Sequence, residues 1–263
     1  MSPPTASPRS MLRTAAIAAG RAVSCTGAVV LAYHDITVVA RGYHVTAGEL
    51  GRHIELLRSS GLRIVPLAAL VDALEAGEAV DGLAAVTFAD ALLGVAELAL
   101  PVLERLDTPA TVFAVAERLG SEPDWTTGEQ RTLTVRELAD LATAPGITIG
   151  SHAATHRSLP GLDDSELDAE LRGARATLAA VVGAPVDLLA YPFGHHDDRV
   201  RAAARTAGYR AGFTFLNGRI EPDQDRFRLP RLTMGPHHRR LRLAHHLARV
   251  PGSWPDTQRA VVP

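Results

Sequence analysis

The composition is poor in cysteine, and lysine is absent. The single cysteine, Cys25, cannot form a disulfide within the chain, so nothing in the sequence indicates an oxidising compartment. All 27 basic residues are arginines, and 29 acidic residues offset them to a formal net charge of −2 at pH 7. A chain so close to neutral has no global field to attract nucleic acid or an acidic membrane surface, so we expect neither as a partner.

Long apolar runs and glycine-rich phosphate loops are missing as well. No run of apolar residues is long enough to span a bilayer. The stretch closest to a signal-peptide core, AAIAAG at residues 15–20, is too short, and Arg21 interrupts it. We therefore expect residues 1–25 to be a disordered segment of a cytoplasmic protein, with secretion as the alternative.

What the chain does contain is a regular alternation of strand-like and helix-like segments. Buried strand patterns occupy residues 28–34, 83–88, 110–116, 146–152, 186–194 and 209–215, with shorter ones at 63–67 and 226–234. Helical patterns separate them, and two begin at capping boxes, Thr46 with Glu49 and Thr134 with Glu137. Repeated strand-then-helix units with apolar strands predict a parallel sheet covered by helices, as a barrel or a doubly wound sheet.

The length favours one large domain. At 263 residues and 46% hydrophobic, the chain can bury a full core, and α/β barrels commonly reach this size as single units. We assign residues 26–236 to this domain. Residues 237–263 form a basic tail in which Leu241, Leu243 or Ala244, and Leu247 make an apolar stripe at helical spacing.

Side chains that bind metals follow two of the expected strands. Asp90 comes directly after the strand at 83–88, and His152 and His156 follow the strand at 146–152. The carboxyl ends of parallel strands meet at one edge of the sheet, so these side chains are expected to converge. Two imidazoles four residues apart can lie on one face of a helical turn and bind one cation. Each pattern alone is weak, because an aspartate after a strand is often a helix N-cap.

Two histidines and one carboxylate are together a common ligand set for a hydrolytic Zn²⁺. Such a set leaves positions open for water and substrate. Ni, Co, Mn or Fe would accept the same ligands. The sequence therefore predicts a divalent metal site at the carboxyl edge of the sheet.

Four motifs in chain order resemble those of the NodB-type polysaccharide deacetylases, carbohydrate esterase family four. Residues 87–91, TFADA, resemble the family's T-F-D-D-G, and residues 152–156, HAATH, resemble H-[ST]-x-x-H. Residues 191–194, YPFG, resemble a strand that ends in a P-[YF]-G turn. The opening VVLAYHDI, residues 29–36, is similar to the L-x-Y-H-x-I start of the poly-N-acetylglucosamine deacetylase subgroup.

The resemblance implies an α/β fold, a distorted (β/α) barrel of the NodB homology type in one domain, with one divalent metal ion. It implies Asp90, His152 and His156 as metal ligands, the backbone N–H of Tyr191 as a donor to the oxyanion, and residue 89 as the general base. The family has aspartate at this last position, whereas this chain has Ala89. An engineered Asp-to-Ala change, which we favour, and a naturally base-deficient protein both explain the alanine. Either way, we expect metal and ligand binding to persist and the rate to be ~10²–10⁴-fold lower.

Further departures concern the acid and the substrate contacts. The family often has an arginine ahead of the proline of the third motif, where this chain has Ala190 and Tyr191, and its late L-x-H motif is not clearly present. We take His237 as the acid, with His238, His195 or His196 as substitutes. The expected substrate-binding residues are Pro192, Phe193, His195, Trp125 and His34. A packing role for Trp125 and His34 fits the sequence equally well.

We therefore expect a metal-dependent hydrolase that removes an N-acetyl or other small N-acyl group from an amino sugar, in a metabolite or a polysaccharide. Two alternatives stay open. The chain is a non-catalytic protein that binds metal and ligand on the same barrel, for which Ala89 is the main support. Or it hydrolyses linear or cyclic amides that are not sugars.

Overall fold

The computed structural model describes residues 26–39, 44–125 and 130–235, together with residues 15, 243, 244 and 247. Apart from residue 15, the expectation for residues 1–25 lies outside the described residues, and so does the proposed acid His237. Within the described part, no helix is both long and apolar enough to cross a membrane.

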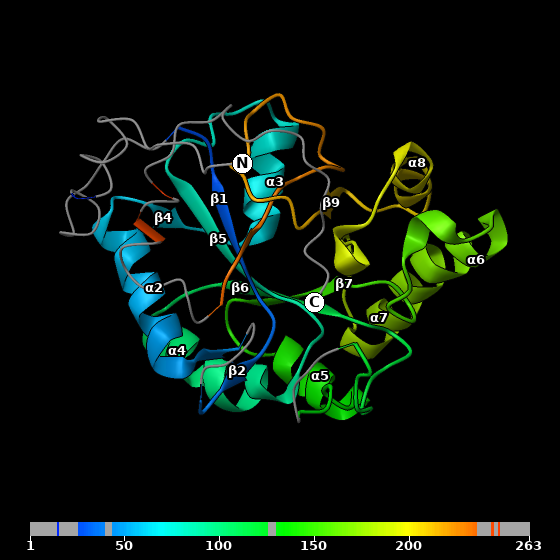
Figure 1. Ribbon diagram of the computed structural model, residues 1–263, viewed down its shortest axis with the longest axis horizontal. Coiled ribbons are helices and arrows are strands. Elements are labelled where there is room, and N and C mark those ends of the chain that lie inside the picture. The colour runs from blue at the N-terminus through cyan, green and yellow to red at the C-terminus, as the bar shows by residue number, and fades with distance from the viewer. Residues whose placement is uncertain are drawn as a thin grey trace, which may run out of the picture.

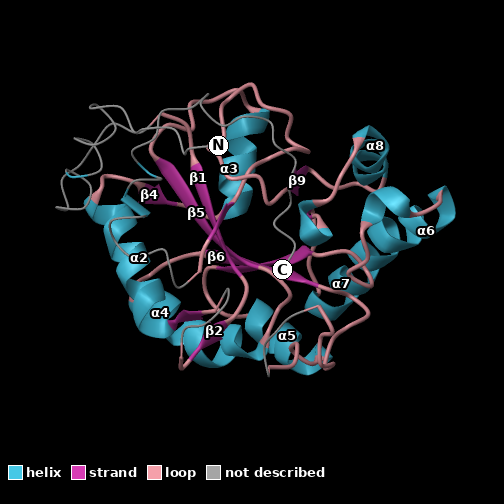
Figure 2. Cartoon of the chain, viewed as in Figure 1, coloured by secondary structure: helices cyan, strands magenta, loops and turns pink. Residues whose placement is uncertain are grey.

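A curled parallel sheet forms the centre of the fold (Figure 1, Figure 2). Its hydrogen-bonded order is β10-β1-β5-β6-β7-β8-β9, and a short strand, β4, pairs with the start of β5. The strands are β1 Val29–Tyr33, β4 Arg63–Ile64, β5 Leu83–Phe88, β6 Ala110–Ala114, β7 Ile147–Ser151, β8 Leu188–Ala190, β9 Ala211–Phe213 and β10 Leu232–Thr233. Two further strands, β2 Ile36–Thr37 and β3 Val45–Thr46, pair with each other. The main strands are near-continuous apolar runs because core packing covers both of their faces.

One chain segment connects the two ends of the sheet. The N–H of Leu229 donates to the carbonyl of Gly212 (3.0 Å) in β9, and the N–H of Thr214 donates to the carbonyl of Leu229 (2.8 Å). The same segment continues into β10, which pairs with β1, and there the N–H of Met234 donates to the carbonyl of Ala32 (2.8 Å). The distorted barrel is therefore confirmed. The doubly wound alternative is wrong, because this segment bonds to β9 at one end of the sheet and continues into β10 at the other, so the sheet curls onto itself.

Helices surround the sheet (Figure 1). They are α2 Ala47–Ser59, α3 Leu67–Glu75, α4 Leu100–Arg105, α5 Val135–Ala142, α6 Asp164–Asp168, α7 Ala174–Val182 and α8 Asp198–Thr206, with π-helical turns Val95–Ala99 before α4 and Ala169–Gly173 before α7. The expected capping boxes start α2 at Thr46 and α5 at Thr134. A third box, at Asp163 with Glu166, starts α6.

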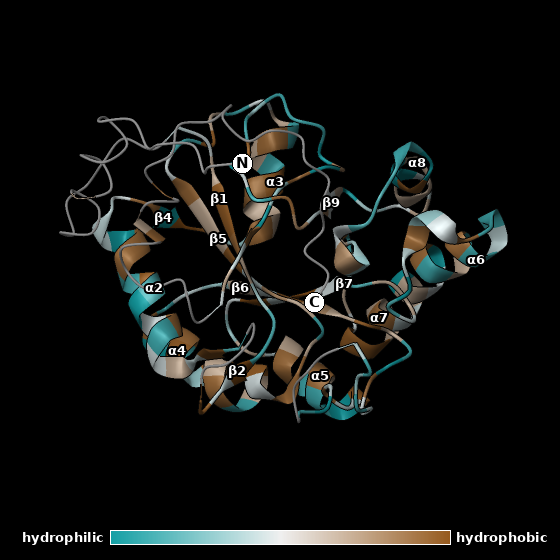
Figure 3. Cartoon of the chain, in the orientation of Figure 1, coloured by the Kyte–Doolittle hydropathy of each residue, from teal (hydrophilic) through white to brown (hydrophobic). Residues whose placement is uncertain are grey.

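Side chains of the strands alternate between the two faces of the sheet. Leu31, Phe88 and Val112 lie in a core cluster with the apolar faces of α2, α4, α5 and α7. Val30, Ala85, Phe113 and Phe213 lie in a second cluster with the apolar face of α3. The first cluster also contains Leu243, Ala244 and Leu247, so these three residues of the tail's apolar stripe are buried. Figure 3 shows this division, with hydrophobic ribbon in the strands and hydrophilic stretches on α6 and α8.

Candidate metal centre

The three expected metal ligands lie together. The Oδ1 atom of Asp90 is 3.6 Å from Nε2 of His152 and 3.4 Å from Nε2 of His156, and all three residues are buried. A tetrahedral Zn²⁺ with ligands at about 2.0–2.2 Å holds its ligand atoms roughly 3.3–3.6 Å apart. The end of β5 supplies Asp90, and the loop after β7 supplies both histidines, as the sequence predicts.

The protonation states of these residues suit a cation. Nδ1 of His152 donates to the carbonyl of Ala190 (2.7 Å), which leaves the lone pair of Nε2 directed at Asp90. Burial lowers the pKa of His152 well below its usual range and that of His156 to about 3, so both imidazoles are neutral. Burial also raises the pKa of Asp90 to about 7, and its Oδ1 has no hydrogen-bond donor among the described residues. Two neutral imidazoles and an unpaired buried oxygen fit a divalent ion. The ion would supply the positive charge that a buried carboxylate needs as a partner.

The loop that carries the two histidines is not helical, so the expected helical turn is wrong. Ala153 has a φ of +62° and His156 a φ of +67°, which the right-handed helix does not allow. The buried carboxylate of Glu170 holds the loop instead. It accepts hydrogen bonds from the N–H groups of Ala154 (2.8 Å) and Thr155 (3.0 Å) and from the hydroxyl of Thr155. Glu170 lies in the π-helical turn before α7 and is a positioning residue that sequence reasoning missed.

Replacing Glu170 by glutamine should weaken metal binding about 10–100-fold, the usual cost of disturbing the groups behind a ligand. The negative charge that both loop N–H groups face at one oxygen is lost. The other oxygen, which accepts from the Thr155 hydroxyl, becomes an NH₂ group that cannot accept. Competition of zinc with a chromophoric chelator measures the change. Glu55→Gln, on the exposed face of α2, is the matched control and should bind zinc as the unmodified chain does. Equal affinity in both variants would remove Glu170 from this role.

The turn at residues 191–194 corrects a second expectation. The N–H of Tyr191 donates to the carbonyl of Phe213 (3.0 Å), and its hydroxyl donates to the carbonyl of Phe227 (3.0 Å). Both donors of Tyr191, the N–H and the hydroxyl, are therefore engaged in hydrogen bonds, and neither is free for an oxyanion. Two residues on, Phe193 has a φ of +56°, and its ring centroid lies 4.6 Å from that of His156. No backbone acceptor among the described residues takes the N–H of Phe193.

The other expected substrate contacts lie around the same site. The ring of Trp125 stacks on His156 with centroids 4.3 Å apart, and His34 stacks on Phe215 at 5.4 Å. His195 is partly exposed, and its Nδ1 lies 2.9 Å from the hydroxyl oxygen of Ser158. Pro192 is buried at the start of the turn. Trp125 thus covers a metal ligand, a position where an aromatic ring can contact a sugar.

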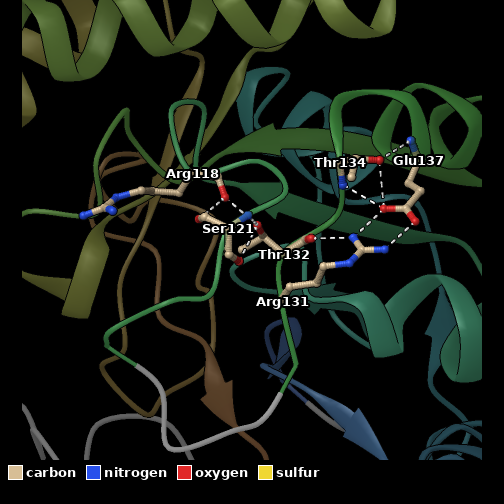
Figure 4. A network of polar contacts seen from close by, with 6 residues as sticks. All are labelled: Arg118, Ser121, Arg131, Thr132, Thr134 and Glu137. Atoms are coloured by element: carbon tan, nitrogen blue, oxygen red, sulfur yellow. Dashed lines mark hydrogen bonds and ion pairs between the residues drawn. The ribbon is translucent and has the colours of Figure 1, made fainter.

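The segment that carries Trp125 is fixed on both sides by polar contacts (Figure 4). Arg131 forms two hydrogen bonds with the carboxylate of Glu137, both 2.7 Å, and this ion pair joins the segment to the first turn of α5. The hydroxyl of Ser121 donates to the carbonyl of Arg118 (2.7 Å), and the N–H of Ser121 donates to the hydroxyl oxygen of Thr132 (3.1 Å). The insertion is therefore anchored close to the site.

Residues with a strained backbone conformation cluster around the candidate metal centre. Six residues other than glycine have a positive φ among the described residues, and only Asp107 lies away from the site. The other five are Asp90, Ala91, His156, Ala153 and Phe193. Strain of this kind costs of order 1–3 kcal/mol per residue and is typical of functional sites.

Two buried charged residues near the site were missed by sequence reasoning. Asp35, directly after His34, is fully buried, and burial raises its pKa to about 7. Arg231, just before β10, is also fully buried, and burial lowers its pKa to about 9. Arg231 therefore brings an arginine to this region from the segment before β10. In the family the arginine often precedes the proline of the third motif. A charged residue inside a strand pattern was the signal in the sequence.

Comparisons with known proteins agree with this geometry. The family model described as Polysaccharide deacetylase matches residues 76–212. Bacillus subtilis YxkH, named for a polysaccharide deacetylase, is 24% identical over 79% of this chain and 71% of its own length. The poly-beta-1,6-N-acetyl-D-glucosamine N-deacetylase of Staphylococcus epidermidis is 25% identical over 73% of this chain and 68% of its own.

Solved structures share the fold. The Streptococcus pyogenes deacetylase PplD, in complex with acetate, superposes with a TM-score of 0.74 at 18% identity, covering 85% of this chain and 99% of PplD. IcaB from Ammonifex degensii gives a TM-score of 0.71 at 21% identity, covering 85% of this chain and 98% of IcaB.

Proposed function

Since this chain belongs to the polysaccharide deacetylase family, we propose that it is a metal-dependent amide hydrolase in a base-deficient form. Its substrate would be an amino sugar from which it removes an N-acetyl group. The observation that carries this proposal is the convergence of Asp90, His152 and His156, with their donor atoms within 4.8 Å of one another.

These three residues would hold one divalent ion, most readily Zn²⁺. The ion would polarise the amide carbonyl and lower the pKa of a water molecule. The protein contributes the fixed orientation of the ligands, through the bond from His152 to Ala190 and through Glu170 behind His156. Both supports keep the ligands in place before substrate arrives.

The N–H of Phe193 is the donor that we assign to the developing oxyanion. It lies in a turn whose ring contacts His156, and a positive φ at Phe193 persists only because the surrounding contacts fix the turn. A fixed donor of this kind is typically worth about 3–4 kcal/mol of transition-state stabilisation.

The group that the site lacks is the proton acceptor. Ala89 is fully buried at the end of β5 and precedes Asp90, which is engaged as a ligand in this account. A methyl group cannot take a proton from the attacking water. Ala89 is also the observation that favours the second candidate function, a non-catalytic protein that binds metal and ligand.

The test is an assay of zinc-loaded Ala89→Asp protein against a panel of N-acetylhexosamines and a panel of cyclic imides. Deacetylation of the sugars supports the hydrolase of amino sugars. Hydrolysis of the imides alone supports the hydrolase of other amides. Metal and sugar binding without hydrolysis supports the non-catalytic protein.

Removing the ring of Trp125 should weaken sugar binding. In the Ala89→Asp background, Trp125→Ala is expected to raise KM about 2–10-fold with little change in kcat, since an aromatic contact contributes about 0.5–1.5 kcal/mol. Trp125→Phe keeps a stacking face and should restore most of the affinity. Zinc titrations of both variants must match the parent, because Trp125 also stacks on His156. An unchanged KM in Trp125→Ala would show that the ring only packs against the site.

A further inference from the structure

Arg231 is a buried cation without a carboxylate partner of its own. Its side chain is fully buried, and its Nε donates to the carbonyl of Thr214 (3.1 Å). The two terminal nitrogens have no hydrogen-bond acceptor among the described residues. A buried charge left in this state is strongly destabilising, and a guanidinium presents two parallel N–H donors that match one carboxylate.

Arg231 and Ala89 lie on the same inner face of the barrel. Leu232 pairs with Leu31, so the backbone of Arg231 is level with Val30, and its side chain extends along this face to the ring of Phe113. Phe88 pairs with Tyr33 on one side and with Val112 on the other, and all three side chains point outward. The next residues of the three strands, His34, Ala89 and Phe113, therefore share the inner face as neighbours. The N–H of Ala89 continues this ladder by donating to the carbonyl of Tyr33 (2.7 Å).

The guanidinium lies over the ring of Phe113, a neighbour of Ala89, and over the ring of Phe215. It is 5.3 Å from the ring centroid of Phe113 and 4.7 Å from that of Phe215, and Phe215 stacks on His34. The methyl group of Ala89 lies between Phe113 and His34. A carboxylate added beyond that methyl would lie on the same face as the guanidinium, near the ring of Phe113.

The charged groups around Arg231 do not neutralise it once a metal ion occupies the site. Asp90 attracts Arg231, but a metal ion at the site would compete for that carboxylate. The remaining titratable groups that interact with Arg231 are His34 and His152, and burial together with Arg231 lowers the pKa of both, so neither offsets its charge. No other carboxylate interacts with Arg231 in the described part of the chain.

We propose that Arg231 and the space beside Ala89 form a binding site for a small monocarboxylate such as formate, held by two parallel N–H···O bonds. Formate has the same atoms as the carboxylate that an aspartate at position 89 would carry. It therefore supplies the group that the alanine lacks, and it neutralises the charge of Arg231.

This site adds a base to the reaction, a consequence that rests on the proposed function. The bound carboxylate accepts a proton from the attacking water while the water oxygen bonds to the amide carbon and the C=O pair moves onto the carbonyl oxygen. The formic acid so produced returns the proton to nitrogen as the C–N bond breaks. No oxidant or further reactant is required.

Calorimetric titration of sodium formate into the zinc-loaded chain tests the site without any need for activity. We expect saturable one-to-one binding that weakens by about tenfold or more in Ala89→Asp, whose own carboxylate occupies the place, because charge-assisted hydrogen bonds are strong. Ala76→Asp, which adds the same charge at an exposed position, should bind formate as the unmodified chain does. Arg231→Gln should lose binding if it folds.

Two results would overturn the site. The first is the absence of saturable formate binding. The second is equal formate binding to the unmodified chain and to Ala89→Asp, the result expected if formate bound only to the metal. The base role has its own readout: formate should raise the hydrolysis rate of the unmodified chain and leave that of Ala89→Asp unchanged. Binding without a rise in rate would overturn the base role only. Failure of Ala89→Asp to hydrolyse any N-acyl substrate would count against the proposed function and leave the calorimetric result standing.

Discussion

Replacing Ala89 by aspartate is expected to raise the rate of sugar N-deacetylation by ~10²–10⁴-fold, the usual contribution of a general base. The new carboxylate would stand on the inner face between His34 and Phe113, next to the metal ligand Asp90 and on the same face as the guanidinium of Arg231. Arg231 would hold it ionised and orient it. Release of acetate from an N-acetylhexosamine oligomer, measured at equal zinc content, gives the ratio of rates.

Ala89→Asn is the matched control for this gain. Its side chain has nearly the same shape and fills the same space, but an amide does not accept a proton at neutral pH. It should remain as slow as the unmodified chain. A gain in both variants would point to packing in place of base catalysis. An Ala89→Asp protein that loads zinc and deacetylates nothing would leave the non-catalytic binding protein as the better reading.

Removal of one metal ligand should abolish the stabilisation that zinc gives. At a free zinc concentration 100 times its Kd, binding to the folded chain adds about 2.7 kcal/mol to the free energy of unfolding. For a chain of this size that corresponds to a rise in Tm of about 5–10 °C. His152→Ala loses a ligand whose orientation is fixed by the carbonyl of Ala190, and we expect it to lose nearly all of this rise. Thermal unfolding with and without zinc measures the difference.

His195→Ala is the control for the ligand variant. His195 lies next to the site, with its Nδ1 beside the hydroxyl of Ser158, but is not one of the three grouped donors. It should keep the full rise in Tm. A zinc-dependent rise of the same size in His152→Ala and in the unmodified chain would mean that the ion binds elsewhere.

The parts of the fold that the sequence predicts are those set by local chemistry. A threonine and a glutamate three residues later form the capping boxes that start α2 and α5, and both are present. The strands β1, β5 and β6 follow their apolar runs because they are buried on both faces. The meeting of Asp90 with the two histidines follows from parallel strands that end at one edge.

What the sequence does not predict depends on contacts between distant residues. The hydrogen bonds from the histidine loop to Glu170 span 15 and 16 residues, and no local sequence pattern predicts them. The N–H of Tyr191 is taken by Phe213 only because β8 and β9 are neighbours in the sheet. Arg231 is visible in the sequence only as a charged residue in a strand pattern, and its burial depends on the closing of the barrel.

The most direct test of the account is a zinc K-edge absorption spectrum of the zinc-loaded chain, with metal content measured on the same sample. We predict one zinc per chain, bound by two imidazole nitrogens and at least one oxygen at about 2.0–2.2 Å. The imidazole signal should fall by half in His156→Ala. A chain that takes up no zinc, or a spectrum without imidazole ligands, would contradict the assignment of Asp90, His152 and His156.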